Sequence, residues 1–312
     1  MVTIKNYKKT FFIFLAAIAI ILTMGLAQFW VVNQQAIVVS PNNKAPAPVL
    51  TDIIEGFAPH KALYDIKMIS NKSGSQIVNV EGEMFFEWLP ACDAWITDHR
   101  FNLYYDYNDS PRVHAVSDFS AYETFDGAHF DFNSVKKRSG TIYSEIRGQA
   151  NINQAHINKD QTHDIDIPSK ATYSKPKDLE HVLDKNTFFP ISHSLEMLTR
   201  AENGEKFFNA YLFDGGDEDG PAEVNSIVLG TVNALAHITP NEKINLELIK
   251  SKAYNIHLAF FETNKYAQTP EYEIEMIMHK NGIISDMIVN YPDFSVSQKL
   301  IALEKINPLN CE

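Results

Sequence analysis

A period-two alternation of apolar and polar residues recurs along the chain and restricts most of it to β-structure. In the run that follows His60, the residues Leu63, Asp65 and Lys67 alternate with Tyr64, Ile66 and Met68. Successive side chains of a strand point to opposite faces, so this pattern is typical of a strand with one buried face. Further strand-like runs cover Gln76–Trp88, Asp93–Tyr107, His163–Ile167, Lys206–Phe213, Asn255–Glu262, Glu271–His279 and Ile283–Tyr291.

Turn residues separate several of these runs. Asn281-Gly282 lies between the last two runs, and this dipeptide favours a tight hairpin because a type I′ turn needs two residues at positive φ. Asp126-Gly127 and Asp214-Gly215-Gly216 predict two more turns. No internal repeat of 20–50 residues is visible, which argues against a propeller or a solenoid. We therefore expect one antiparallel β domain that is curled or barrel-like.

One or two short helices are expected to accompany the sheet. The best candidate runs from Pro190 to about Asn203, since proline suits the first helical turn and Gly204 is placed as a C-terminal stop. A second short helix is predicted over Lys177–Asp184.

The N-terminus carries a targeting signal. Phe11–Val32 is free of charged residues and long enough to span a bilayer as a helix, and Lys5, Lys8 and Lys9 precede it. The positive-inside rule then places the rest of the chain outside the cytoplasm. Residues 1–33 are interpreted either as a cleaved signal peptide, with small residues at Gly25 to Ala27, or as an uncleaved membrane anchor.

The remaining chain divides into a linker and one domain. Residues 34–58 are rich in Pro and Asn, a composition typical of an extended linker. Residues 59–312 are expected to form a single domain.

The formal net charge of −12 and the absence of a basic stripe argue against nucleic acid as a partner. Two cysteines, Cys92 and Cys311, are too few for a structural zinc site but enough for one disulfide.

The acidic segment Asp214–Gly220 superficially resembles the GGDEF signature of diguanylate cyclases, but Asp219 occupies the place of the phenylalanine. The segment also lacks the ligand spacing of an EF-hand calcium loop. We interpret it as an exposed acidic hairpin tip.

No other pattern in the sequence predicts catalysis or metal binding. The histidines are scattered, and neither a G-x-S-x-G motif, an S-x-x-K motif, a P-loop nor a dinucleotide fingerprint is present. Glu271, Glu273 and Glu275 share one face of a strand and are interpreted as solvated, whereas Met276 and Met278 are expected in the core. We predict no catalytic, cofactor-binding or metal-binding residue and a non-enzymatic protein.

Several segments of the chain, in consistent order, resemble one known family. They are His60–Met68, Glu81–Trp95, Phe188–Phe208, Tyr211–Gly216, Thr269–Met276 and Asn281–Val296, followed by Cys311. Together they resemble the EipB family of cell-envelope integrity proteins of Gram-negative bacteria. The resemblance implies a periplasmic domain whose antiparallel strands form a spiral, incompletely closed β-barrel. It also implies a disulfide between Cys92 and Cys311, and it offers no catalytic residues.

Two functions follow from these expectations. The first is a periplasmic protein that maintains envelope integrity as a binding or scaffold domain for envelope components or partner proteins. The alternative is a lipid or lipoprotein carrier whose open barrel shelters acyl chains in an apolar groove. In either case the domain is expected in the periplasm, either soluble after cleavage or tethered to the inner membrane.

Overall fold

A single sheet of fifteen strands dominates the structure, a computed structural model that describes residues 55–153, 169–262 and 268–307. The spatial order of the strands is β8-β7-β6-β5-β4-β3-β2-β1-β15-β14-β13-β12-β11-β10-β9. All neighbouring strands are antiparallel except β9 and β10, which are parallel. The sheet is thus two meanders joined at the pair β1–β15.

The first meander contains β1 (His60–Asn71), β2 (Ile77–Pro90), β3 (Ala94–Tyr107), β4 (Val113–Thr124), β5 (His129–Arg138), β6 (Thr141–Asn151), β7 (Lys170–Lys175) and β8 (Glu180–Val182). The second contains β9 (Thr187–Phe188), β10 (Phe207–Leu212), β11 (Ala222–Val232), β12 (Ala253–Phe261), β13 (Tyr272–His279), β14 (Ile284–Asn290) and β15 (Phe294–Lys305). Between these strands, the described residues form one α-helix, α2 (Pro190–Glu202), and two short 3₁₀ helices, η1 (Ala234–His237) and η2 (Leu246–Ile249).

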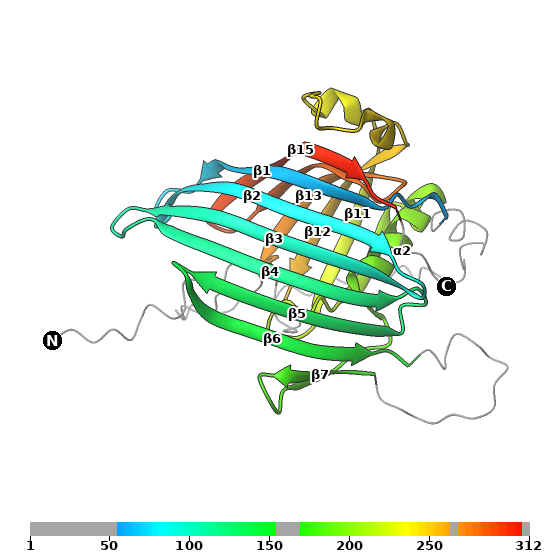
Figure 1. The fold of residues 1–312 in the computed structure, drawn as a ribbon, viewed down its shortest axis with the longest axis horizontal. Coiled ribbons are helices and arrows are strands. Elements are labelled where there is room, and N and C mark those ends of the chain that lie inside the picture. The colour runs from blue at the N-terminus through cyan, green and yellow to red at the C-terminus, as the bar shows by residue number, and fades with distance from the viewer. Residues whose placement is uncertain (1–54, 154–168, 263–267, 308–312) are drawn as a thin grey trace, which may run out of the picture.

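The sheet curls on itself without closing. Strands β1 to β7 form one layer, and strands β11 to β13 lie behind them (Figure 1). The two edge strands, β8 and β9, are separated by only four residues, 183–186, but they are not paired with each other. The predicted spiral, incompletely closed antiparallel barrel is therefore confirmed.

The alternation in the sequence corresponds to the inner and outer faces of this curled sheet. In β1, His60, Ala62, Tyr64 and Ile66 are buried, whereas the residues between them are partly accessible to solvent. The same period-two burial occurs in β12, where Tyr254, Ile256, Leu258 and Phe260 are buried. The hydrophobic core thus lies on the inner face of the curled sheet.

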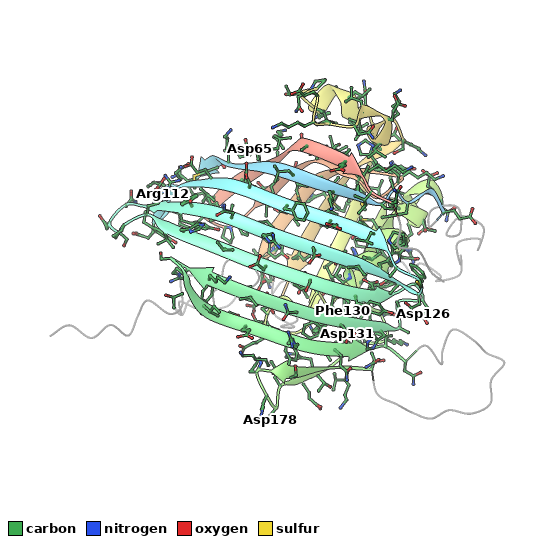
Figure 2. The ribbon with its side chains drawn as sticks, in the orientation of Figure 1. Asp65, Arg112, Asp126, Phe130, Asp131 and Asp178 are labelled. Carbon is green, nitrogen blue, oxygen red and sulfur yellow. The ribbon has the colours of Figure 1, made fainter. Side chains whose placement is uncertain are left out.

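Helix α2 lies at one end of the strands (Figure 1). We call this the helix end; there β2 ends, β3 begins and the turn containing Asp126 joins β4 to β5. The opposite, far end carries the connection containing Arg112 between β3 and β4, and Figure 2 shows Arg112 and Asp126 at the two ends of the front layer. The predicted helix from Pro190 is confirmed, and Gly204 adopts φ +81° directly after its C-cap.

Two predicted turns are also confirmed. At Asn281-Gly282, the His279 amide donates to the Ile283 carbonyl (2.8 Å), and Gly282 has φ +87°. At Asp126-Gly127, the Gly127 amide donates to the Thr124 carbonyl (2.8 Å).

The helix predicted over Lys177–Asp184 is wrong. Asp178 adopts φ +64°, which turns the chain so that Glu180–Val182 pairs with β7 as strand β8. The predicted strand His163–Ile167 and the apolar segment Phe11–Val32 lie outside the described residues. Within the described ranges, no helix combines the length and the apolar composition needed to cross a bilayer.

Candidate functional site

A row of aromatic rings crosses the inner face of the front layer. The register of β2, β3 and β4 places Phe86 opposite His99 and His99 opposite Phe119. The ring centroids are 4.7 Å apart for Phe86 and His99 and 5.6 Å apart for His99 and Phe119. We call these three residues the aromatic row.

The side chains of the aromatic row belong to the inner face of the curled sheet. Burial by the surrounding protein lowers the pKa of His99 to about 4, so the imidazole is neutral at pH 7. The three side chains nevertheless remain only partly buried. On the back layer, Ile274 of β13 and Met287 of β14 are also partly buried, and together with Phe86 they pack against both large core clusters. We call the space between these residues the lumen.

Helix α2 occupies the helix end of the spiral. Its Leu195 and Leu198 belong to one buried cluster with Trp88 of the front layer and with Ile256 of the back layer. The helix thereby packs against both layers. The lumen is bounded by an apolar helix face on this side.

A buried carboxylate holds the start of this helix. Glu123, on β4, is 1% exposed and accepts hydrogen bonds from the backbone amides of Ile191 (2.8 Å) and Ser192 (2.6 Å). These amides are at the positive N-terminal end of the helix, where they have no intrahelical acceptor. Burial raises the pKa of Glu123 to about 7, and the bonds from Ile191 and Ser192 oppose this shift.

Lys136 points into the lumen beside the aromatic row. It lies on the inner face of β5, where the register places it opposite Ser117 of β4 and Ser144 of β6. The residue is 8% exposed, and burial lowers the pKa of its ammonium group. Within the described part of the chain, the ammonium makes no hydrogen bond or direct ion pair.

The loop between β10 and β11 folds inward towards Lys136. Gly215 lies against Phe132 so closely that a Cβ atom there would be 2.4 Å from the Phe132 ring. Tyr173 of β7 donates its hydroxyl to the Asp217 carbonyl (3.0 Å) and thereby secures the loop to the front layer. The expected exposed hairpin tip is therefore wrong for Asp214 to Asp217, because the small glycines allow the loop to pack on the sheet. Only Glu218 and Asp219 in this segment are exposed.

Two carboxylates of this loop lie near Lys136. Asp214 accepts a hydrogen bond from the Gly216 amide (2.8 Å), and Asp217 accepts one from the Asp219 amide (2.9 Å). Burial raises the pKa of both carboxyls, that of Asp217 to about 8, while the charge of Lys136 opposes the shift. We call Lys136, Asp214 and Asp217 the polar cluster. This cluster could not be predicted from the sequence, because Lys136-Lys137 resembles an ordinary solvated pair.

The remaining histidines offer no catalytic centre among the described residues. His279 contacts Ser285 (3.0 Å) and His193 contacts Ser226 (3.5 Å), but all four residues are buried in the core. Neither serine is therefore accessible to a substrate. No group of His, Cys, Asp and Glu side chains in the described ranges is arranged to hold a metal ion.

Other predicted residues are placed as follows. Met276 and Met278 are in the core as expected, and Glu273 pairs with His257 (3.2 Å). Cys92 lies in the exposed turn between β2 and β3. Cys311 lies outside the described residues, so the pairing of Cys92 with Cys311 stays a prediction.

A shallow groove on the outer surface is a second candidate for binding. It lies between β1, β15 and residues 242–245, where Ile244 bridges to Leu303. Its charged rim includes Lys61, Lys243 and Glu304. Unlike the lumen, it contains no buried charged side chain.

The fold defines a class of protein: a spiral, incompletely closed antiparallel sheet with a helix at one end and partly buried aromatic side chains on its inner face. The family model described as EipB-like matches residues 52–307, and the chain belongs to this family.

A relative and a solved structure agree with this assignment. The cell envelope integrity protein EipB of Brucella abortus (strain 2308) is 28% identical over 249 residues, covering 79% of this chain and 83% of the relative. The crystal structure of a beta-barrel-like protein of a domain of unknown function from Brucella abortus is also similar. It has a TM-score of 0.69 and 26% identity, and the match covers 80% of this chain and 99% of that chain. The resemblance read from the sequence is thus confirmed.

Proposed function

We propose that this protein is a non-enzymatic factor that maintains the integrity of the cell envelope. In this proposal it acts in the periplasm as a binding or scaffold domain for envelope components or partner proteins. The observation that carries the proposal is the family match over residues 52–307, supported by the name of the Brucella abortus relative.

Deleting the gene should sensitise cells to detergents and to antibiotics that act on the cell wall. The physical reason is that a weakened envelope admits these agents or fails under their action. The measurement is survival of the deletion strain across a concentration series, with the wild-type gene supplied in trans as the control. Unchanged resistance to all such agents would contradict the proposal.

The periplasmic location rests on the apolar run Phe11–Val32 and the lysines before it. Alkaline phosphatase fused after Glu312 should be active, because that enzyme folds only where its disulfides form. A cytoplasmic reporter at the same position should be silent, and the reverse pattern would refute export. The mass of the mature N-terminus distinguishes a cleaved signal from an anchor that tethers the domain to the inner membrane.

The accessible lumen favours a second candidate function, a lipid or lipoprotein carrier. Phe86 and Phe119 on the front layer and Ile274 and Met287 on the back layer offer apolar surface to a ligand. Burying an acyl chain there would stabilise the complex by about 0.8 kcal/mol per CH₂ group. Native mass spectrometry of protein purified from membranes should then detect co-purified lipid.

A further inference from the structure

The polar cluster places charged side chains on the inner face of the sheet, where they do not contribute to apolar packing. Lys136 is more than nine-tenths buried, yet its ammonium makes no hydrogen bond or direct ion pair within the described residues. Its charge interacts most strongly with Asp217 and next with Asp214. A charge in such a partly desolvated position attracts an opposite charge more strongly than one in bulk water, so a ligand group that lies between the cation and the two carboxylates would be stabilised.

The carboxylates also retain bonding capacity. In Asp214 and in Asp217, Oδ1 accepts one backbone amide of the loop, whereas Oδ2 accepts no hydrogen bond from another described residue. Each of the two side chains therefore has an oxygen available for a donor in the lumen, and a cation bound there would favour the ionised form of both carboxyls, which burial disfavours.

The polar cluster adjoins the aromatic row. Phe119 is directly opposite Ser134 on β5, and Lys136 lies two residues further along that strand on the same face. Phe119 is thus a diagonal neighbour of Lys136, at about 7–8 Å. Ser117 and Ser144, which flank Lys136 across the sheet, add hydroxyl donors on the same face.

From this arrangement we propose that the lumen binds a lipid whose headgroup carries both a phosphate and a primary ammonium, as in phosphatidylethanolamine. The inference rests on the carrier function proposed above and specifies its ligand. Lys136, Ser117 and Ser144 bind the phosphate, Asp214 and Asp217 bind the ammonium, and the acyl chain lies along the aromatic row.

The chemistry of the cluster discriminates between headgroups. A primary ammonium donates three hydrogen bonds, which the carboxylate oxygens accept. The quaternary ammonium of phosphatidylcholine has no N–H to donate. Phosphatidylglycerol has no cation, so it would leave both carboxylates in the lumen without a partner.

Native mass spectrometry of the full chain tests this ligand. The protein is incubated in detergent micelles with equimolar phosphatidylethanolamine, phosphatidylglycerol and phosphatidylcholine of identical acyl chains. We expect one bound lipid, with phosphatidylethanolamine favoured about tenfold over each competitor, because charged hydrogen bonds differ between the complexes by about that factor.

Two variants separate the roles of the charges. Lys136→Met should weaken binding of all three lipids about tenfold, since each carries the phosphate. The double variant Asp214→Asn, Asp217→Asn should lose the preference for phosphatidylethanolamine and still bind phosphatidylglycerol. The matched control is Lys137→Met on the outer face of the same strand, where Lys137 lies 3.8 Å from Asp118; its lipid binding should equal that of the wild type. Melting temperatures establish that each variant is folded.

The outcomes distinguish this inference from the function on which it rests. The headgroup assignment would be overturned if the wild-type protein bound all three lipids equally, or if a folded Lys136→Met variant bound lipid as well as Lys137→Met does. Either result would still be compatible with a lipid carrier. If Lys136→Met does not fold, the double variant Asp214→Asn, Asp217→Asn provides the test. An unchanged preference of this variant for phosphatidylethanolamine would also overturn the headgroup assignment. Absence of any bound lipid would refute the carrier function itself.

Discussion

Glu123 shows how one side chain couples the helix to the sheet. Its carboxylate holds the first amides of α2 from a position on β4, but burial penalises the charged form and raises its pKa to about 7. The folded-state pKa exceeds the reference value of 4.5. The native state therefore binds this proton more tightly than the unfolded state, and the contribution of Glu123 to stability falls as pH rises from about 4.5 to about 7.

Glu123→Gln should remove this pH dependence. Each pKa unit corresponds to about 1.4 kcal/mol, so the wild type should lose roughly 3 kcal/mol of unfolding free energy from this residue between pH 4.5 and pH 8. The measurement is urea unfolding of both proteins at pH 5 and pH 8. The variant should resemble the wild type at pH 5, where the glutamic acid is neutral, and gain relative to it at pH 8. The control is Glu83→Gln, at an exposed position of β2, and equal pH slopes for wild type and Glu123→Gln would contradict the interpretation.

At the scale of the element, α2 illustrates both what local sequence determines and what it leaves open. Pro190 and Gly204 mark its limits correctly, because first-turn proline and C-terminal glycine act through the backbone nearby. Its position between the two layers depends on Trp88 and Ile256, which are far away in the sequence. No pattern within the helix specifies those partners.

Leu198→Ala should destabilise the protein by about 2–5 kcal/mol, the usual cost of removing a fully buried leucine. Leu198 is 0% exposed and belongs to the cluster that joins the layers. Chemical unfolding measures the change. Ser194→Ala on the same helix is the matched control and should stay within about 0.5 kcal/mol, since this residue is only partly buried. A small effect of Leu198→Ala would mean that α2 contributes little to the packing of the layers.

Some strands could be predicted from the sequence, and others could not. Strands β1, β2, β3, β10, β12, β13 and β14 overlap predicted runs because their inner faces are mainly apolar. Strands β4 and β5 were not predicted, because their inner faces also carry the polar residues Glu123, Ser134 and Lys136. These polar residues disturb the alternation, and they include the side chains on which the candidate site depends. The inward fold of the Asp214 loop likewise depends on its contact with Phe132, which is remote in sequence.

At the scale of the whole molecule, the strand order brings the end of β15 close to the end of β2, which precedes Cys92. Lys305, the last residue of β15, is opposite His60 of β1, and His60 is opposite Trp88 of β2. Two strand spacings, about 10 Å, thus separate Lys305 from Trp88, and Cys92 follows Trp88 by four residues. The six residues from Lys305 to Cys311 are long enough to cover that distance.

If the domain is exported to the periplasm as proposed, that oxidising compartment leads us to expect a disulfide between Cys92 and Cys311. It closes a loop of about 220 residues, for which chain entropy gives an upper value of roughly 5 kcal/mol. Non-reducing electrophoresis after thiol alkylation should show no free thiol, and Cys311→Ser should lower the melting temperature. Reduced wild-type protein is the control, because it should melt like the variant. Two freely alkylated cysteines in periplasmic protein would refute the pairing.

The pairing of the first strand with the last has a consequence for how the chain folds. Hairpins within each meander join neighbours in sequence and need no distant partner. The twelve-residue strand β1, in contrast, has an unpaired edge until β15 is available to pair with it. In an exported chain, that interval lasts until the last twelve-residue strand has crossed the membrane. Before then, β1 presents a long edge to which another chain could add a strand.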